Sequence, residues 1–168
     1  MLRGELKGDV VVIENGEEVA ELESKSYGYR IERGLSLSLV EAAYLLDRGD
    51  LEVVDESGSN LSFEELVRVG ARYDSNFWVK LSIYSDLRSR GFRVRLLRRG
   101  LEFLVERKVK SGEKRYLVIG LREGVRIGFK EIEAAIRRAR EARRELVFAI
   151  IDKEGNVSYY ALERVMGA

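Results

Sequence analysis

The sequence has 168 residues, 45% hydrophobic and 35% charged, which is enough for one compact domain or two small ones with a buried core. It contains no Cys and no His, which excludes disulfides, thiolate and imidazole metal sites, and hydrolases of the Ser-His-Asp or Cys-His type. The net charge of +1 hides an asymmetry, since residues 1–75 carry 8 Lys and Arg against 17 Asp and Glu (net −9), whereas residues 76–168 carry 22 against 12 (net +10). The basic C-terminal part suits a polyanion such as RNA.

Two short apolar runs near the N-terminus indicate β-strands. Residues 10–13 and 19–22 flank the pair Asn15-Gly16, which is the preferred pair for a two-residue hairpin turn. The sequence therefore predicts a β-hairpin here.

Two capping signals predict the first helices. Ser38 followed by Glu41 forms a capping box before an apolar stretch. Ser62 followed by Glu65 repeats the device. The apolar segment 51–54 between the two helices has the length of a short strand.

A longer helix is expected from Ser75 onward. Its apolar stripe consists of Phe77, Leu81 and Tyr84, and Gly91 is expected to end it as a C-cap. We expect the junction between two domains at this helix.

Strands and one helix fill the remainder of the chain. The apolar pattern predicts strands at residues 92–96, 101–105, 116–121, 146–151 and 157–162. The helix 129–143 precedes the fourth of these strands, and its predicted buried residues are Phe129, Ile132, Ile136 and Ala139. Gly155 can supply the positive φ that the last turn requires.

These elements define the expected fold class. The C-terminal order α-β-β-β-α-β-β is typical of an α/β (α+β) fold with a central mixed sheet. We therefore expect a small mixed N-terminal domain over residues 1–75 and a second domain over residues 76–168.

Four segments in a fixed order resemble one known family. They are residues 38–49 (SLVEAAYLLDRG), 83–91 (IYSDLRSRG), 116–118 (YLV) and 149–160 (AIIDKEGNVSYY). Together they resemble the archaeal tRNA-splicing (tRNA-intron) endonucleases, and the resemblance covers nearly the whole chain. It implies a nuclease-like, that is restriction-endonuclease-like, C-terminal domain.

The resemblance also implies a cleavage chemistry without a metal or other cofactor. A Tyr acts as base on the ribose 2′-hydroxyl, a His protonates the leaving oxygen, and a Lys stabilises the charge on the phosphate. The Tyr position falls at Glu106, or at Val105 if the preceding loop is counted without a gap. The His position falls at Glu113 and the Lys position at Arg144. The family's catalytic trio is therefore missing.

A different active site could be built from the same region. Glu102, Glu106 and Glu113 could hold a magnesium ion, as in many metal-dependent nucleases. The alternative interpretation makes them solvated positions that pair with nearby cations, namely Arg107, Lys108 and Lys110.

The resemblance further implies RNA-binding and docking positions. Arg137, Arg140 and Arg144 have the spacing of one helical face, and Arg137 has the register of a family arginine that stacks on an extruded bulge nucleotide. With Lys114 they are the RNA-binding candidates. In the family, the acidic turn near the C-terminus inserts into another subunit, and the adjacent strand pairs across an interface. The docking candidates are Asp152, Lys153, Glu154, Gly155, Tyr159 and Tyr160.

The expected function is therefore that of a structural subunit. It would pair with a catalytic chain as a heterotetramer of two plus two and act on precursor tRNA at bulge-helix-bulge elements, where the complex leaves 2′,3′-cyclic phosphate and 5′-hydroxyl ends. The open alternatives are a self-sufficient ribonuclease and an RNA-binding protein without a nuclease partner. No apolar run reaches the roughly 20 residues of a membrane span, and the absence of Gln and Thr with only two Met indicates a hyperthermophilic, cytoplasmic origin.

Overall fold

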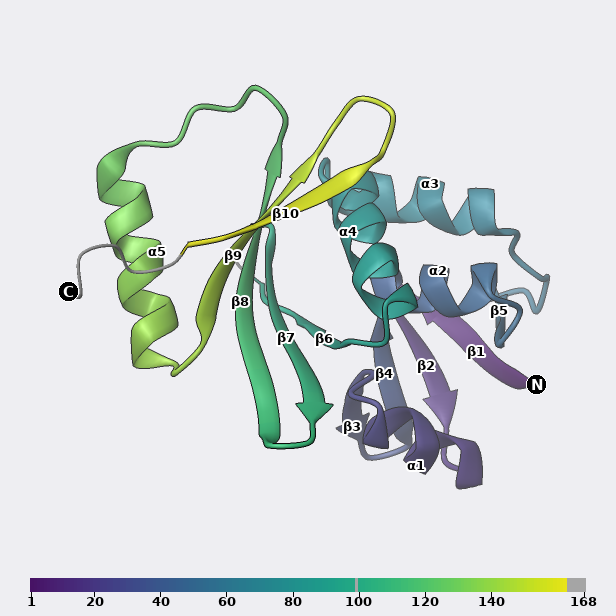
Figure 1. The fold of residues 1–168 in the computed structure, drawn as a ribbon. Coiled ribbons are helices and arrows are strands. Elements are labelled where there is room, and N and C mark those ends of the chain that lie inside the picture. The colour runs from purple at the N-terminus through teal and green to yellow at the C-terminus, as the bar shows by residue number, and fades with distance from the viewer. Residues whose placement is uncertain (99, 163–168) are drawn as a thin grey trace. The chain divides into compact units, whose positions relative to one another are not determined.

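The computed structural model describes residues 1–98 and 100–162, and they fall into two compact units, Met1–Ser85 and a second that begins at Asp86 (Figure 1). Each unit has a mixed five-stranded sheet, so the predicted α+β class is confirmed. Helix α4 (Phe77–Ser89) belongs to both units. We expected the junction at this helix with the division after residue 75, and the chain passes from the first unit to the second within the helix, between Ser85 and Asp86.

The first unit has a sheet with the strand order β3-β4-β2-β1-β5. Only β1 and β5 are parallel neighbours; the other pairs are antiparallel. Helix α2 packs against β2, β4 and β5 and also contacts α3. The elements are β1 (Leu2–Lys7), β2 (Val10–Glu14), α1 (Glu17–Ser24), β3 (Tyr29–Ile31), β4 (Gly34–Ser38), α2 (Leu39–Asp47), β5 (Leu51–Val54) and α3 (Phe63–Tyr73).

The capping box at the start of α2 is confirmed. The Ser38 hydroxyl accepts the Glu41 N–H at 3.2 Å, and the Glu41 carboxylate accepts the Ser38 N–H at 3.0 Å. The second carboxylate oxygen accepts the Gly28 N–H at 2.7 Å, which explains how a glutamate can be buried here. At α3, Ser62 accepts the Glu65 N–H at 3.1 Å. Both helices thus begin where the sequence indicated.

The predicted hairpin around Asn15-Gly16 is wrong. The segment after Gly16 forms helix α1, and β2 pairs with β1 and β4 instead. The physical reason is that two acidic residues stabilise the first helical turn, and that Val19 and Leu22, three residues apart, are both buried on one helical face. The helical spacing of Val19 and Leu22 therefore outweighs the turn preference of Asn15-Gly16.

The second unit has a sheet with the strand order β10-β9-β8-β7-β6. Its strands and the helix between them follow the predicted order, and β8 and β9 are the parallel pair. The elements after α4 are β6 (Arg93–Leu96), β7 (Glu102–Val109), β8 (Gly112–Arg122), α5 (Phe129–Glu141), β9 (Glu145–Ile151) and β10 (Val157–Ala161).

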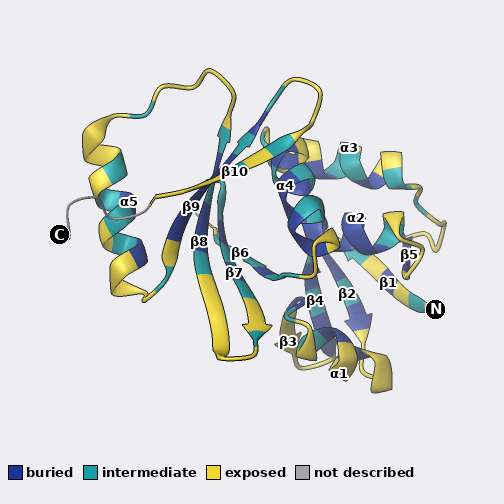
Figure 2. Ribbon diagram, viewed as in Figure 1, coloured by how far each residue is buried: buried dark blue, intermediate teal, exposed yellow. Residues whose placement is uncertain are grey.

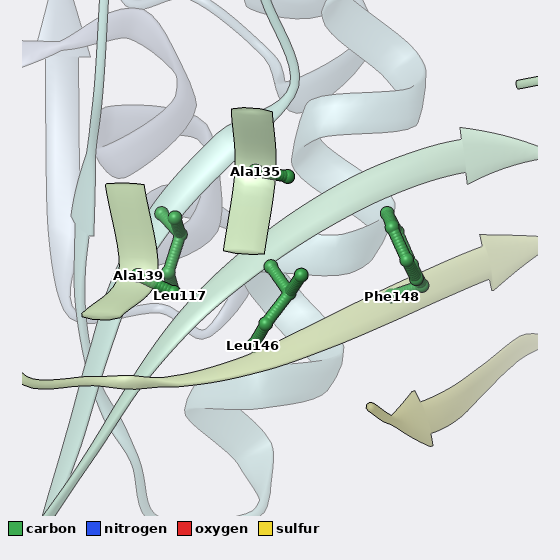
Figure 3. Packing of buried hydrophobic residues seen from close by; sticks show 5 residues of the cluster. All are labelled: Leu117, Ala135, Ala139, Leu146 and Phe148. Atoms are coloured by element: carbon green, nitrogen blue, oxygen red, sulfur yellow. The ribbon is translucent and has the colours of Figure 1, made fainter. Parts of the chain in front are cut away.

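Helix α5 covers one face of this second sheet. Figure 3 shows Ala135 and Ala139 of α5 beside Leu117 of β8 and Leu146 and Phe148 of β9, and these five residues form one buried cluster. Ala139 is buried as expected, but Phe129 is 86% exposed. That part of the prediction is wrong because Phe129 is the first residue of the helix, where the apolar stripe has not yet reached the sheet.

Candidate functional site

Three charged positions of the second unit lie on the sheet face that α5 covers. Glu106 of β7 lies opposite Arg93 of β6 and Arg115 of β8, so one row of charges crosses three strands. Glu113 lies two residues before Arg115 on β8 and therefore projects from the same face. Arg144 joins this group from the connection between α5 and β9. The structure thus brings Glu106 and Arg144 into contact, and Glu113 lies on the same sheet face.

The end of α5 turns Arg144 inward. Arg143 takes a left-handed conformation with a φ of 56°, and the Arg144 N–H bonds the Ala139 carbonyl at 2.8 Å, which is the pattern of a Schellman C-cap. Only 6% of the Arg144 side chain is exposed. The prediction that Arg137, Arg140 and Arg144 share one helical face is therefore wrong for Arg144, which lies beyond the last helical residue.

The guanidinium of Arg144 is held by three acceptors. Its Nη2 lies 2.6 Å from Oε1 of Glu106, and its Nη1 donates to the carbonyls of Tyr116 at 3.2 Å and Val105 at 3.5 Å. Charge-assisted bonds of this kind are short and strong. The same carboxylate oxygen is also 3.9 Å from Nε of Arg115. Arg144 therefore donates its hydrogen bonds to acceptors within the second unit.

The other two glutamates are bound by other arginines. Oε1 of Glu113 lies 2.5 Å from Arg93, and Oε1 of Glu102 lies 2.7 Å from Arg138 on α5. The predicted partners of these glutamates, Arg107, Lys108 and Lys110, are thus wrong, because the strand register and α5 bring arginines closer. Among residues 1–98 and 100–162, no three acidic side chains are gathered as metal ligands.

The remaining RNA-binding candidates are on the surface. Arg137 and Arg140 of α5 and Lys114 of β8 are exposed. Arg138, between the two arginines, is the one that turns to the sheet and bonds Glu102. Exposure leaves the three candidates accessible to a polyanion but does not assign them a ligand.

The turn after β9 is preorganised by Asp152. Its Oδ1 accepts the N–H groups of Asn156 and Glu154, both at 2.9 Å, and these bonds, the Asn156 bond foremost, lower the pKa of Asp152. Gly155 has a φ of 89°, as the turn prediction required. Lys153, Glu154 and Gly155 are exposed. The turn therefore presents a fixed backbone shape with its central residues in solvent.

The two tyrosines of β10 differ. The Tyr159 hydroxyl donates to Oδ2 of Asp86 at 2.6 Å, and the guanidinium of Arg90 lies 5.3 Å from the Tyr159 ring centroid. Burial, followed by the bond to Asp86, raises the pKa of Tyr159 above its ordinary value. Tyr160 is 56% exposed. Since β10 is an edge strand, Tyr160 is the docking candidate that a partner could contact, while Tyr159 ties β10 to α4.

Both parts of the chain match known family models. Residues 2–67 match the tRNA intron endonuclease N-terminal domain, and residues 77–159 match the tRNA intron endonuclease catalytic C-terminal domain. The chain belongs to the tRNA intron endonuclease family. The charged row at Glu106 lies within the segment that matches the catalytic domain of this family.

Relatives named tRNA-splicing endonuclease match along most of their length. The protein of Thermococcus onnurineus is 36% identical over 162 residues, which cover 95% of this chain and 94% of that protein. The protein of Pyrococcus abyssi is 37% identical over 160 residues, covering 94% and 93%. That of Methanococcus maripaludis is 37% identical over 158 residues, covering 92% and 89%. In the described part of the chain, no helix is long and apolar enough to cross a membrane.

Sequence reasoning singled out Glu102, Glu106 and Glu113 but missed the arginines that contact them. Arg93, Arg115 and Arg138 contact the glutamates only because of strand register and helix packing. The alternation of β6 carried a usable signal, since Arg93 and Arg95 alternate with the buried Val94 and therefore share a face.

We expect Tyr159→Phe to lower the free energy of unfolding of the second unit by about 1 kcal/mol, because it removes a hydrogen bond to a carboxylate at a half-buried site. The measurement is amide hydrogen exchange of β9 and β10. Tyr160→Phe is the matched control and should leave exchange unchanged, because its side chain is exposed. Equal effects of the two substitutions would contradict a stabilising hydrogen bond between Tyr159 and Asp86.

Proposed function

We propose that this chain is the non-catalytic, structural subunit of a tRNA-splicing endonuclease. It assembles with a related catalytic chain, two of each, and the complex removes introns from precursor tRNA at bulge-helix-bulge sites in the cytoplasm. The observation that carries the proposal is the ion pair between Glu106 and Arg144. By the family resemblance, Glu106 stands where the catalytic base is required, and Arg144 stands where a free cation is required.

The chemistry of those positions supports the proposal. Metal-free cleavage of RNA requires a base for the 2′-hydroxyl, an acid for the leaving oxygen and a cation for the phosphate. Neither Glu106 nor Val105 is a phenol, and the whole chain lacks His. Glu113 stands where the resemblance requires His, and its side chain is engaged in an ion pair with Arg93. The cation at Arg144 is bonded to three acceptors within the unit.

The features that remain favour assembly and RNA positioning. The C-terminal part is basic, and Arg137, Arg140 and Lys114 are exposed on it. The preorganised turn at Asp152 and the edge strand β10 with Tyr160 offer two elements to a partner chain. The cyclic phosphate and 5′-hydroxyl ends would thus be formed by groups of the catalytic chain.

Cleavage of precursor tRNA by separate and mixed chains tests the proposal. The assay compares this chain alone, a family member from the same genome that has Tyr, His and Lys at the three positions, and the mixture. We expect no cutting by this chain, strong cutting by the mixture, and a mixed species with the mass of two plus two by light scattering. Robust cutting by this chain alone would overturn the proposal, and its loss in EDTA would then identify a metal-dependent nuclease.

A further inference from the structure

The end of the β7–β8 hairpin is a two-stranded ribbon that extends beyond the second sheet. The pairing of β6 with β7 stops at Glu106, and the pairing of β9 with β8 begins at Tyr116. From there to the turn, β7 and β8 pair only with each other. Figure 1 shows the two strands joined by a tight turn, and Figure 2 shows most of this end as exposed. Most residues of the ribbon are therefore exposed to solvent.

This ribbon carries an excess of positive charge. Residues 107–115 hold five Lys and Arg against one Glu. The single carboxylate, that of Glu113, is bonded to Arg93, which lies outside the ribbon. Arg115 is 3.9 Å from the Glu106 carboxylate, and Lys108 lies opposite Glu113 on the neighbouring strand without forming an ion pair with it. Within residues 1–98 and 100–162, no ion pair engages the other four, which are Arg107, Lys108, Lys110 and Lys114.

Two of these cations directly face each other. Arg107 of β7 and Lys114 of β8 are cross-strand partners on the same face. Like charges in this position destabilise an antiparallel pair, so the pairing does not serve the stability of the hairpin. The guanidinium of Arg107 lies 5.0 Å from the centroid of the Phe92 ring, which fixes its position while leaving its N–H groups free for a ligand. Two exposed cations are thus held side by side, one of them against an aromatic ring.

We infer that the ribbon end, residues 107–114, is a contact site for the phosphate backbone of RNA, with Arg107 and Lys114 as its central pair. The inference rests on the RNA substrate of the proposed function and adds a location to it. Backbone phosphates fit because they offer repeated negative charge along a row of cations. No aromatic side chain is exposed on the ribbon to stack on a base, so the contact is independent of sequence.

Binding of a plain RNA duplex at several salt concentrations tests this site. The full chain is titrated with a fluorescent RNA hairpin of arbitrary sequence that has no bulge, and the dependence of log affinity on log salt is measured. Lys114→Gln is expected to weaken binding several-fold at low salt and to reduce the slope by about 0.7 to 0.9, which corresponds to one lost phosphate contact. The double variant Arg107→Gln/Lys114→Gln should reduce the slope by about 1.5.

Matched variants make the test specific. Arg68→Gln/Arg72→Gln removes the same charge from exposed positions on α3 and should leave the slope at the wild-type value. Arg107→Lys/Lys114→Arg keeps both charges and should keep the slope. Lys114→Gln alone leaves the Arg107 contact with Phe92 intact. A reduced slope in this variant therefore cannot be explained by loss of that contact.

The results separate this inference from the proposed function. An unchanged slope in both Lys114→Gln and the double variant would overturn the site, and so would an equal loss in the α3 control. If the ribbon variants instead abolished assembly with the catalytic chain but not duplex binding, an acidic protein surface would be the ligand and the inference would be wrong. The plain duplex cannot be spliced, so failure of the cleavage experiment leaves the binding result intact.

Discussion

Replacing Arg144 by Met is expected to lower the free energy of unfolding of the second unit by about 2 to 3 kcal/mol. The substitution removes one partner of a largely buried ion pair and leaves the Glu106 carboxylate and two carbonyls without their donor. The loss of stability is smaller than for a fully buried ion pair, because 26% of the Glu106 side chain is exposed and water can screen its charge. Amide hydrogen exchange of β7, β8 and β9 measures the change.

Two further variants separate charge from packing. Arg144→Met/Glu106→Leu removes both charges and should recover most of the loss, since replacing both members of a pair by apolar groups is often neutral. Arg144→Lys, which restores the residue type that the family resemblance implies, should cost about 1 kcal/mol because an ammonium cannot reproduce the planar fork of three bonds. Unchanged exchange in Arg144→Met would contradict the buried position of the guanidinium.

The same double variant also tests the role of this pair in function. If the chain is a structural subunit, Arg144→Met/Glu106→Leu should assemble with the catalytic chain and support cleavage at the wild-type rate. A folded, assembled double variant that no longer supports cleavage would show that Arg144 or Glu106 acts in the reaction. This outcome would contradict the proposed function without affecting the stability argument.

Several helices, strands and turns were predicted correctly from signals that lie within a few residues of each other. The capping pair Ser38 and Glu41 defined the start of α2 because its two hydrogen bonds lie within one helical turn. The strands of the second unit were predicted by their apolar patterns, and Gly155 correctly marked the last turn. The order of elements, and hence the fold class, follows from such signals.

The parts that sequence reasoning missed have two kinds of cause, competing local signals and tertiary contacts. Asn15-Gly16 has the chemistry of a hairpin turn, but the pairing of β2 with β1 and β4 left the following segment to form a helix. Arg144 had the spacing of the helical stripe, yet the left-handed Arg143 ended the helix before it. The ion pairs of Glu102 and Glu113 required the register between strands. Of these three features, the ion pairs alone require contacts between residues far apart in the sequence.

Gly34→Ala is expected to destabilise the first unit by about 3 kcal/mol or more. Gly34 begins β4 and pairs with Glu14 of β2. A Cβ atom at this position would lie 1.9 Å from the backbone carbonyl oxygen of Ile13, and the φ of 157° is one that side-chain-bearing residues rarely adopt. Overpacking against flexible side chains typically costs about 1 to 3 kcal/mol, and a clash with backbone is worse because relief requires a shift of β2 against β4. Hydrogen exchange of the β2 and β4 amides measures the effect.

Gly16→Ala is the matched control for this substitution. Gly16 lies in the same unit, at the start of α1, and a Cβ atom there would meet nothing within 4 Å. Its φ of −179° is ordinary extended backbone, so the variant should lose at most about 1 kcal/mol, because Gly is preferred over Ala at the N-cap of α1. If both substitutions had the same small effect, β2 and β4 could separate at little cost, and the register between Glu14 and Gly34 would be wrong. A loss confined to Gly34→Ala, with exchange of β7 to β9 unchanged, would show that the first unit can be destabilised while the charged row at Glu106 stays intact.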